Sequence, residues 1–309
     1  MPSPTGNVVW MDGIHVLWDQ ATTHVLDYVL HYGCGVFEGI RSYETHNKKN
    51  AAIFRADDHI KRLYHSASVL DMEIPFHPNE IKEAMISTIA KNHLKDSYIR
   101  PLVWMGKGEM GLHAKENQVR TLIAAWNWGK YLGEKPGVRV TISSVVRNHP
   151  KSFPPGAKIC GSYVNSRLAS IEAKRRGFDE ALMLDDRGYV SEGPGENVFF
   201  VKGSMLITPA PYNILEGITR QSIMDLGAEL SFPTVIKEIK PDELKDMDEA
   251  FFVGTAAEVT PILEIDKIKF GDGKPGKITT KIQDIYYKTV RGFNPDKEHW
   301  LTYIYPREL

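Results

Sequence analysis

The amino-acid sequence predicts a mixed α and β protein of two domains. Runs rich in β-branched and aromatic residues alternate with amphipathic segments along the whole chain, and a glycine-rich, charged stretch divides it near the middle. With 309 residues, the chain is long enough for two hydrophobic cores. We expect a small N-terminal domain over 1–128, an interdomain linker over 129–137 and a large C-terminal domain over 138–309.

The first half opens with a predicted β-hairpin over 8–18, because Asp12-Gly13 between two β-rich runs is a strong signal for a two-residue turn. Asp57-Asp58 is the predicted N-cap of a helix, whose apolar residues recur at helical spacing up to Leu70. The remaining expected elements are a strand with glycine-rich turns over 28–45, a strand at 51–55, a helix over 78–94, and strands near 97–106 and 119–129.

The segment GKYLGEKPGV, 129–138, carries three glycines, a proline and charges, and this composition is typical of a linker. The second half then repeats the mixture of elements. We expect strands over 138–147, 180–192, 197–209 and 250–265, and helices over 166–178, 218–230 and 276–291.

The charge balance narrows the class of partner. Lys and Arg number 38 against 39 Asp and Glu, so the chain lacks the overall basic field of nucleic-acid or membrane-surface binders, and a small polar metabolite fits better. The two cysteines, Cys34 and Cys160, have neither disulfide-framework nor metal-ligand spacing, and we expect no metal. With no signal-peptide pattern and no apolar run of about 18 residues, we expect a cytoplasmic protein.

Lys158 stands in PGAKICGSYVNSRL, among small and apolar residues that offer no carboxylate. A lysine in such a run is usually solvated on a loop. Burial would instead lower its pKa and make it a nucleophilic amine. The stretch alone leaves both interpretations open.

Phosphate-binding features are present but unspecific. The chain has neither a P-loop nor a dinucleotide fingerprint, yet EGITRQS (216–222) and GTAAE (254–258) place Gly and Thr where a loop could enter a helix or turn. Helix capping explains both stretches equally simply. Arg62 lies on a predicted helix, where it is either a surface group or a bidentate phosphate ligand.

Carboxylates and aromatic residues complete the set. Glu192 and Glu196 in SEGPGEN are either loop carboxylates or partners for a heterocyclic nitrogen. Trp126, Trp128 and Tyr131 are core residues or pocket walls. A lysine, a phosphate-binding arginine, a carboxylate and Gly/Thr turns are together what a pyridoxal-phosphate enzyme needs.

Nine stretches carry a resemblance that covers almost the whole chain, in family order and spacing: HYGCGVFEGIR, HIKRLYHSA, SYIRPL, GEMGL, WNWGKYLG, AKICGSYVNS, SEGPGEN, GITR and GTAAE. The chain resembles the bacterial branched-chain amino acid aminotransferases, which are class IV, fold-type IV enzymes dependent on pyridoxal 5′-phosphate. The resemblance implies the two-domain fold of the D-amino acid aminotransferases, with the active site between the domains.

For the cofactor, the resemblance implies that Lys158 is the Schiff-base lysine and the base for proton transfer. Glu192 would face the pyridine nitrogen, and Tyr163 the phenolic oxygen. The phosphate ligands would be Arg62, Ile218, Thr219 and Thr255.

For the substrate, the resemblance implies that Tyr98, with the amides of Thr255 and Ala256, takes the α-carboxylate. Arg100 would take the distal carboxylate of glutamate. The pocket walls would be Phe37, Trp128, Tyr131 and Tyr163, and three residues would come from a neighbouring subunit: Tyr32, Met110 and Leu112.

The implied activity is reversible amino transfer between leucine, isoleucine or valine and 2-oxoglutarate. A homodimer would be the minimal active unit, with a hexamer built as a trimer of dimers as a larger form. A D-amino acid aminotransferase or an aminodeoxychorismate-lyase-like enzyme of the same fold is the alternative, and a non-catalytic cofactor-binding protein is the alternative from another class.

Overall fold

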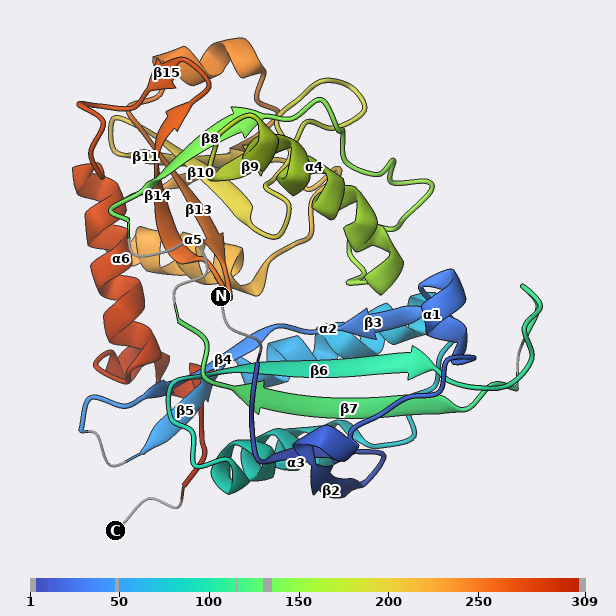
Figure 1. The fold of residues 1–309 in the computed structure, drawn as a ribbon. Coiled ribbons are helices and arrows are strands. Elements are labelled where there is room, and N and C mark those ends of the chain that lie inside the picture. Colours follow the sequence, from blue (N-terminus) through green and yellow to red (C-terminus); the bar gives the residue numbers. More distant parts are fainter. Residues whose placement is uncertain (1–3, 48–49, 115, 130–134, 306–309) are drawn as a thin grey trace. The chain divides into compact units, whose positions relative to one another are not determined.

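The computed structural model describes residues 4–47, 50–114, 116–129 and 135–305. Their contacts divide the chain into two compact units, each built on one sheet (Figure 1). The first unit comprises Met1–Gly129, Ala157–Gly161 and Lys288–Leu309. The second comprises Lys130–Gly156 and Ser162–Tyr287.

The sheet of the first unit has the strand order β16-β5-β4-β6-β7-β1-β2, with β3 pairing with β6, and all these pairs are antiparallel. The strands are β1 (Val8–Met11), β2 (Ile14–Leu17), β3 (Gly35–Phe37), β4 (Ile40–Glu44), β5 (Ala51–Phe54), β6 (Ser97–Met105), β7 (Val119–Trp126) and β16 (Leu301–Tyr303).

The predicted hairpin is confirmed. β1 and β2 pair around Asp12 and Gly13, whose φ angles of 49° and 96° are both positive, as this tight turn requires. The Asp12 carboxylate also accepts hydrogen bonds from Thr121 N and the Arg120 side chain, which ties the turn to β7.

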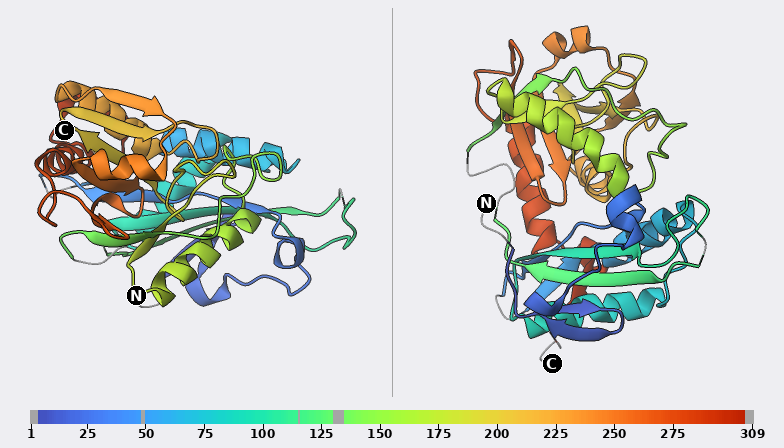
Figure 2. Two further views of the ribbon diagram at one scale, coloured as in Figure 1. Left: turned by 90° about the horizontal axis from the view of Figure 1, so that it is seen from above. Right: turned by 45° about the vertical axis from the view of Figure 1, so that its right-hand side comes forward.

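Three α-helices begin in the first unit: α1 (Tyr28–Tyr32), α2 (Ala56–Val69) and α3 (Pro78–Lys91). The two long helices confirm the sequence periodicity: α3 packs against β1 and β7, and α2 contacts α3 and β3 (Figure 2). The N-cap of α2 is Arg55, so the prediction of Asp57-Asp58 at that position was wrong. The two carboxylates lie instead in the first helical turn, where the helix dipole favours them.

A strand was expected around residues 28–32, and this expectation was wrong. The segment forms α1, which Gly33 ends in the left-handed conformation at φ 68°. Its residues have high β propensity, but Tyr28 is buried and its hydroxyl donates to Gly111 O. Tertiary packing therefore overrides local propensity here.

The sheet of the second unit has the order β12-β11-β10-β13-β14-β8-β9, with β15 pairing with β14. The pairs β11/β12, β14/β8 and β8/β9 are parallel. The strands are β8 (Val138–Ile142), β9 (Glu180–Leu182), β10 (Asn197–Lys202), β11 (Met205–Pro209), β12 (Thr234–Lys237), β13 (Glu249–Gly254), β14 (Glu258–Ile265) and β15 (Ile268–Lys269).

Three long helices complete the second unit: α4 (Tyr163–Arg175), α5 (Ile218–Glu229) and α6 (Lys277–Val290), the last turn of which is grouped with the first unit. α4 packs against β9, and α5 packs against β12 and β13. A core of large apolar side chains, among them Phe200, Phe252 and Phe270, fills one side of the sheet. The expected strand over 138–147 ends at Ile142, where Ser143 N donates to Leu182 O.

Two segments distinguish the contact-based units from the expected contiguous domains. Residues 157–161 belong with the first unit, because Ile159 bridges to Val36 of β3. Residues 288–309 also join the first unit, because β16 pairs with β5. Neither pairing has a local signal in the sequence, since each joins residues more than a hundred positions apart.

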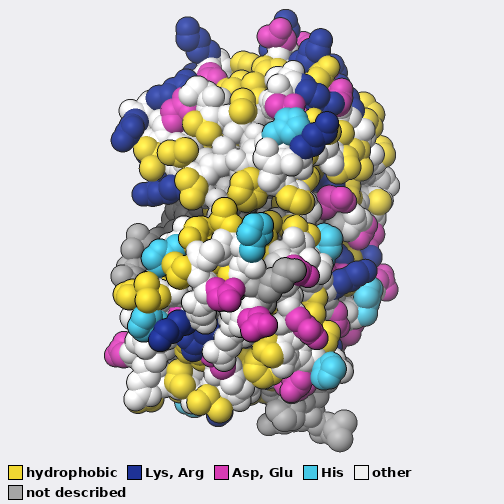
Figure 3. Space-filling model, turned by 90° about the vertical axis from the view of Figure 1, so that its right-hand side faces the viewer, with side chains coloured by type: hydrophobic (Ala, Val, Ile, Leu, Met, Phe, Trp, Pro, Cys, Tyr) yellow, Lys and Arg dark blue, Asp and Glu magenta, His cyan; other side chains and the backbone are white. Residues whose placement is uncertain are grey.

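The charge balance of the sequence is visible on the face drawn in Figure 3, where basic and acidic side chains lie interspersed with hydrophobic ones. Within the described ranges, the structure contains no helix with the length and apolar character needed to cross a membrane.

Candidate active site

The backbone of Lys158 is attached at three points in the first unit. Phe37 N donates to Lys158 O at 3.1 Å, Lys158 N donates to the buried Ser66 Oγ at 2.9 Å, and Ile159 bridges to Val36. The lysine is thereby fixed to both β3 and α2. Its side chain is half-buried, with Nζ 5.0 Å from the ring centroid of Phe37.

Arg62 lies on α2, one helical turn before Ser66, and its guanidinium forms a fork on the carboxylate of Glu38. Nε and Nη2 of Arg62 lie 2.6 Å and 2.9 Å from the two Glu38 oxygens. His59 Nδ1 lies 2.7 Å from Glu38 Oε2. Burial by itself raises the pKa of Glu38, but Arg62 and His59 outweigh it and hold that pKa well below its ordinary value.

Predicted substrate residues gather around the ring of Phe37. The Arg100 guanidinium lies 4.7 Å from the Phe37 centroid and 5.3 Å from that of Tyr98, and its Nη2 donates to the Tyr98 hydroxyl at 3.1 Å. Trp128 meets Tyr98 edge-on, with centroids 4.3 Å apart. The structure therefore brings five predicted residues together in the first unit: Phe37, Tyr98, Arg100, Trp128 and Lys158.

The position of the Tyr98 hydroxyl depends on a glycine. A Cβ atom at Gly39 would lie 2.1 Å from this oxygen, which is closer than real Cβ contacts allow. Gly39 therefore leaves the space that the hydroxyl occupies beside Arg100.

The three residues expected to serve a neighbouring subunit form another group. The Tyr32 hydroxyl donates to Met110 O at 2.7 Å, and Leu112 follows in the same loop with 77% of its surface exposed. This group lies on α1 and the loop after β6. Tyr131, a predicted pocket wall, lies outside the described residues.

In the second unit, Glu192 is a buried carboxylate surrounded by donors. Arg147 Nη2 lies 2.8 Å from Oε1, Asn197 Nδ2 donates to Oε2 at 2.9 Å, and Leu215 N lies 3.2 Å from both oxygens. All these partners are donors, so they match a carboxylate, which only accepts.

Tyr163 begins α4 and is linked to the surroundings of Glu192 by Arg147. The same guanidinium that pairs with Glu192 donates through Nη1 to Ser166 Oγ at 3.0 Å, one turn along α4 from Tyr163. The arginine therefore bridges the start of α4 and Glu192.

The predicted phosphate turns are both helix or strand boundaries. Ile218 and Thr219 are the first residues of α5, with Gly217 as the N-cap, and Thr255 and Ala256 lie in the turn between β13 and β14. A Cβ atom at Gly217 would meet Asn197 Oδ1 at 2.1 Å, so only glycine fits against the residue that also holds Glu192. The amide groups at the start of α5 are oriented as an anion site requires.

Glu196, the other weighed carboxylate, is buried in a different environment. Desolvation and then the charge of Glu180 raise its pKa well above the ordinary value, and Gly195 N donates to its Oε2. A carboxyl group that favours its neutral form is poorly suited to hold a heterocyclic nitrogen protonated, so Glu192 is the better candidate.

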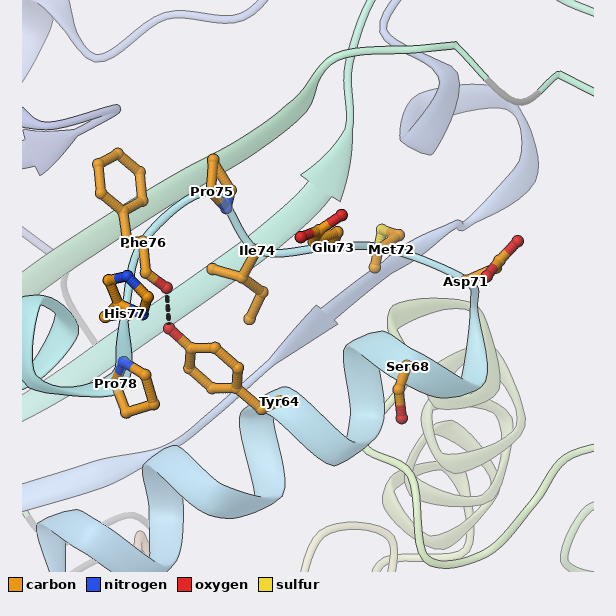
Figure 4. Close-up of a pocket in the computed structure, with 10 residues that line it drawn as sticks. All are labelled: Tyr64, Ser68, Asp71, Met72, Glu73, Ile74, Pro75, Phe76, His77 and Pro78. Atoms are coloured by element: carbon orange, nitrogen blue, oxygen red, sulfur yellow. Dashed lines mark hydrogen bonds between the residues drawn. The ribbon is translucent and has the colours of Figure 1, made fainter.

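A pocket of about 730 Å³ lies between the end of α2 and the loop before α3 (Figure 4). Tyr64 crosses it and donates to Phe76 O. Among its described lining residues, Asp71 and Glu73 are acidic and none is Lys or Arg. This lining repels phosphates and carboxylates, so the pocket does not serve the predicted chemistry.

The family model described as amino-transferase class IV matches residues 35–265, which is more than half of the chain. The chain belongs to the class IV aminotransferases. Members of this family use pyridoxal 5′-phosphate.

Named relatives agree with this class IV assignment. The chain is 47% identical over 300 residues to the branched-chain-amino-acid aminotransferase of Pseudomonas aeruginosa, covering 96% of this chain and 97% of the relative. It is 38% identical to the enzyme of that name from Escherichia coli, over 98% of this chain and 99% of the relative.

Solved class IV structures share the fold. A branched-chain amino acid aminotransferase complexed with N-(5′-phosphopyridoxyl)-L-glutamate, its source abbreviated T.th., matches with a TM-score of 0.94 and 42% identity, over 98% of this chain and all of the other. The Escherichia coli enzyme matches with a TM-score of 0.94 and 38% identity, over 97% of this chain and all of the other. The predicted fold class is therefore confirmed.

The residues of this class IV aminotransferase fit its cofactor by their chemistry. The first unit supplies a primary amine and a guanidinium attached to the same helix, and the second supplies a donor-held carboxylate and a helix N-terminus. These groups match an aldehyde, a phosphate and a protonated ring nitrogen.

Sequence reasoning overlooked two charged residues of this class IV aminotransferase, Glu38 and Arg147. Glu38 stands in the glycine-rich stretch that was singled out, but its partners His59 and Arg62 lie more than 20 positions away. Arg147 was placed in a strand, where it gave no sign of pairing with Glu192, 45 positions further on. In both cases the signal is a tertiary ion pair, which residue spacing does not encode.

Proposed function

We propose that this protein is a branched-chain-amino-acid aminotransferase. It transfers an amino group reversibly between leucine, isoleucine or valine and 2-oxoglutarate, and the products are branched-chain 2-oxo acids and glutamate. The observation that carries the proposal is the cluster around Phe37, in which Lys158 and Arg100 both face one aromatic ring within a chain nearly half identical to an enzyme of this name.

The cofactor role of each residue follows from its chemistry and its place. Bound pyridoxal phosphate supplies an aldehyde that accepts the amino group and a ring that draws off negative charge. Lys158 provides the amine for this aldehyde, and its Nζ moves a proton at the substrate α-carbon. Arg62 and the amides at Ile218, Thr219 and Thr255 bind the phosphate.

Glu192 and Tyr163 orient the ring of the cofactor in this proposal. Glu192 holds the ring nitrogen in its protonated form, because a charged acceptor stabilises a neighbouring cation. The Tyr163 hydroxyl donates to the phenolic oxygen. Arg147 supports both residues, since it contacts Glu192 directly and α4 through Ser166.

Two anionic groups of the substrates are recognised by different residues. Tyr98 and the amides of Thr255 and Ala256 bind the α-carboxylate, and Arg100 binds the distal carboxylate of glutamate. Arg100 Nε is buried and makes no hydrogen bond within the described part of the chain, so a guanidinium donor is left for an incoming anion. Phe37, Trp128, Tyr131 and Tyr163 provide the apolar surface for a branched side chain.

We also propose that a homodimer is the minimal active unit. Exposed apolar side chains gather on α1, on the segment before it and on the loop that it contacts: Val25, Leu26, Leu30, Tyr32 and Leu112. We refer to these five residues as the α1 patch. Covering it with a second copy would remove apolar area from water and bring Tyr32, Met110 and Leu112 to the partner's site. The unpaired cysteines Cys34 and Cys160 and the metabolite substrates suit a cytoplasmic enzyme.

The proposal is tested by replacing the amine. We expect Lys158→Ala to abolish glutamate formation from leucine and 2-oxoglutarate, because no other group of the cluster supplies a primary amine. The variant should also lose the visible absorbance band that borohydride removes from the wild type. Lys151→Ala, at an exposed lysine of the same loop, is the control and should keep full activity. Wild-type activity in Lys158→Ala would refute the assignment.

A further inference from the structure

Glu38 is a buried charge for which the proposed chemistry has no direct use. Its side chain is fully buried, and its neighbours Phe37 and Gly39 both belong to the substrate cluster. It contacts two cationic or titratable residues of α2, His59 and Arg62, and a backbone amide, that of Gly39 at 3.3 Å.

The geometry of this contact is that of a rigid clamp. Both Glu38 oxygens are engaged by Arg62, so the planar fork of the guanidinium is fixed in orientation as well as position. A guanidinium carries five N–H donors, and the bidentate pair commits two of them. His59 Nδ1 fixes the carboxylate from a second direction.

Stability alone is a poor explanation for this clamp. Taking a carboxylate and a guanidinium out of water costs much of what their attraction returns, so buried pairs contribute little to folding compared with apolar packing. What such a pair does provide is a side chain with one allowed position.

The same turn also holds the lysine. Phe37 N donates to Lys158 O, and Glu38 N, one residue later, donates to Pro101 O of β6. Two successive residues therefore fix the backbone of Lys158 and the guanidinium of Arg62. Ser66 on α2 closes the connection by accepting from Lys158 N.

We propose that Glu38 is a positioning residue for the cofactor phosphate: its carboxylate fixes the Arg62 guanidinium at a set distance from Lys158, so that phosphate and aldehyde are bound in register. The proposal rests on the phosphate role proposed above for Arg62. It assigns Glu38 no contact with the cofactor or the substrate.

Two substitutions separate positioning from charge balance. Glu38→Gln removes the charge and turns an NH₂ group toward donors, so Arg62 or His59 loses its partner. Glu38→Asp keeps the charge but shortens the reach by one methylene. Positioning predicts that both variants raise the dissociation constant of the holoenzyme for pyridoxal phosphate, by roughly ten- to a hundredfold. Charge balance predicts tighter binding in Glu38→Gln and wild-type binding in Glu38→Asp, and that result would overturn the proposal.

A double-mutant cycle tests whether Glu38 acts through Arg62. We expect Arg62→Ala to weaken cofactor binding, and Glu38→Gln to add little to the effect of Arg62→Ala. Additive effects would overturn the proposal. If Arg62→Ala alone leaves the dissociation constant unchanged, the phosphate role of Arg62 is wrong and the role of Glu38 is refuted with it. If only the Glu38 variants are unchanged, Arg62 keeps its role and Glu38 loses its own.

A spectroscopic readout distinguishes positioning from a loss of stability. The phosphorus NMR signal of the bound cofactor should shift in Glu38→Asp, the variant more certain to fold, because the phosphate meets a displaced guanidinium. Glu44→Gln, at a carboxylate of the same unit paired with Lys95, is the matched control and should leave both the signal and the dissociation constant unchanged. An unshifted signal in Glu38→Asp, with only the thermal unfolding temperature lowered, would overturn the proposal.

Discussion

Arg100 shows how one side chain can serve two kinds of substrate. Its guanidinium lies against the rings of Phe37 and Tyr98, which provide an apolar and aromatic support for its flat faces. Its edge carries the donors, one of which bonds to the Tyr98 hydroxyl while the buried Nε is without a partner among the described residues. The faces of the guanidinium therefore tolerate a hydrocarbon side chain, and its edge can take a carboxylate.

Replacing Arg100 should separate the two half-reactions. We expect Arg100→Leu to cost glutamate a charge-assisted contact of roughly 1.5–3 kcal/mol, whereas leucine keeps its apolar surroundings. Single-turnover conversion of the cofactor from the pyridoxal to the pyridoxamine form, followed separately with leucine and with glutamate, measures each effect. Equal losses for both amino acids would show that Arg100 holds the α-carboxylate or the scaffold instead.

At the scale of elements, helix ends are completed by groups from other elements. The first amides of α6 are satisfied by Glu249 of β13, whose carboxylate accepts from Ile278 N at 3.0 Å and from Thr279 N and Oγ1 at 2.7 Å. Glycine at position 276 is required for this approach, because a Cβ atom there would lie 1.9 Å from the carboxylate carbon. A strand residue therefore does the work of an N-cap, and its negative charge suits the helix N-terminus.

Removing this cap should destabilise the protein. We expect Glu249→Ala to lower the free energy of unfolding by about 1–2 kcal/mol, because it leaves amide donors of α6 unsatisfied. The midpoint and slope of urea unfolding measure the change. Asp272→Ala, which removes an exposed carboxylate of the same unit from a weak surface pair with Lys274, should be without measurable effect. Equal stability of the two variants would show that water replaces the Glu249 cap.

At the scale of the whole molecule, the α1 patch is the feature that a single chain leaves incomplete. Leu30 has 59% of its surface exposed and Leu112 has 77%. The Tyr28 and Tyr32 hydroxyls join α1 to the loop that carries Leu112, by donating to Gly111 O and Met110 O. The patch is thus a preformed surface, and exposed apolar surfaces of this kind mark association sites.

A charge in the α1 patch should prevent assembly. We expect Leu30→Asp to shift the protein from dimer or hexamer toward monomer in sedimentation velocity, with parallel loss of transamination, since burying an unpaired carboxylate is costly. The control is Ile236→Asp, which places the same charge on a strand of the second unit at a residue with 48% exposure. A wild-type protein that sediments as a monomer and is fully active would contradict the dimer.

The local sequence determined the elements whose stability is local. Helical spacing of apolar residues specified α2, α3, α5 and α6, and Asp12-Gly13 specified the first hairpin, because turn geometry and hydrophobic periodicity act over a few residues. The stretches of the family resemblance were also readable, and the class IV match confirms what they implied about fold and cofactor chemistry.

The tertiary structure decided what depends on contacts between distant residues. It made 28–32 a helix, added β16 to the first sheet and joined Lys158 to β3 and α2. It also paired Glu38 with Arg62 and Glu192 with Arg147, across 24 and 45 positions respectively. Each of these results is set by hydrogen bonds and ion pairs that form only when the chain has closed a long loop, and residue spacing carries no record of which partners will then meet.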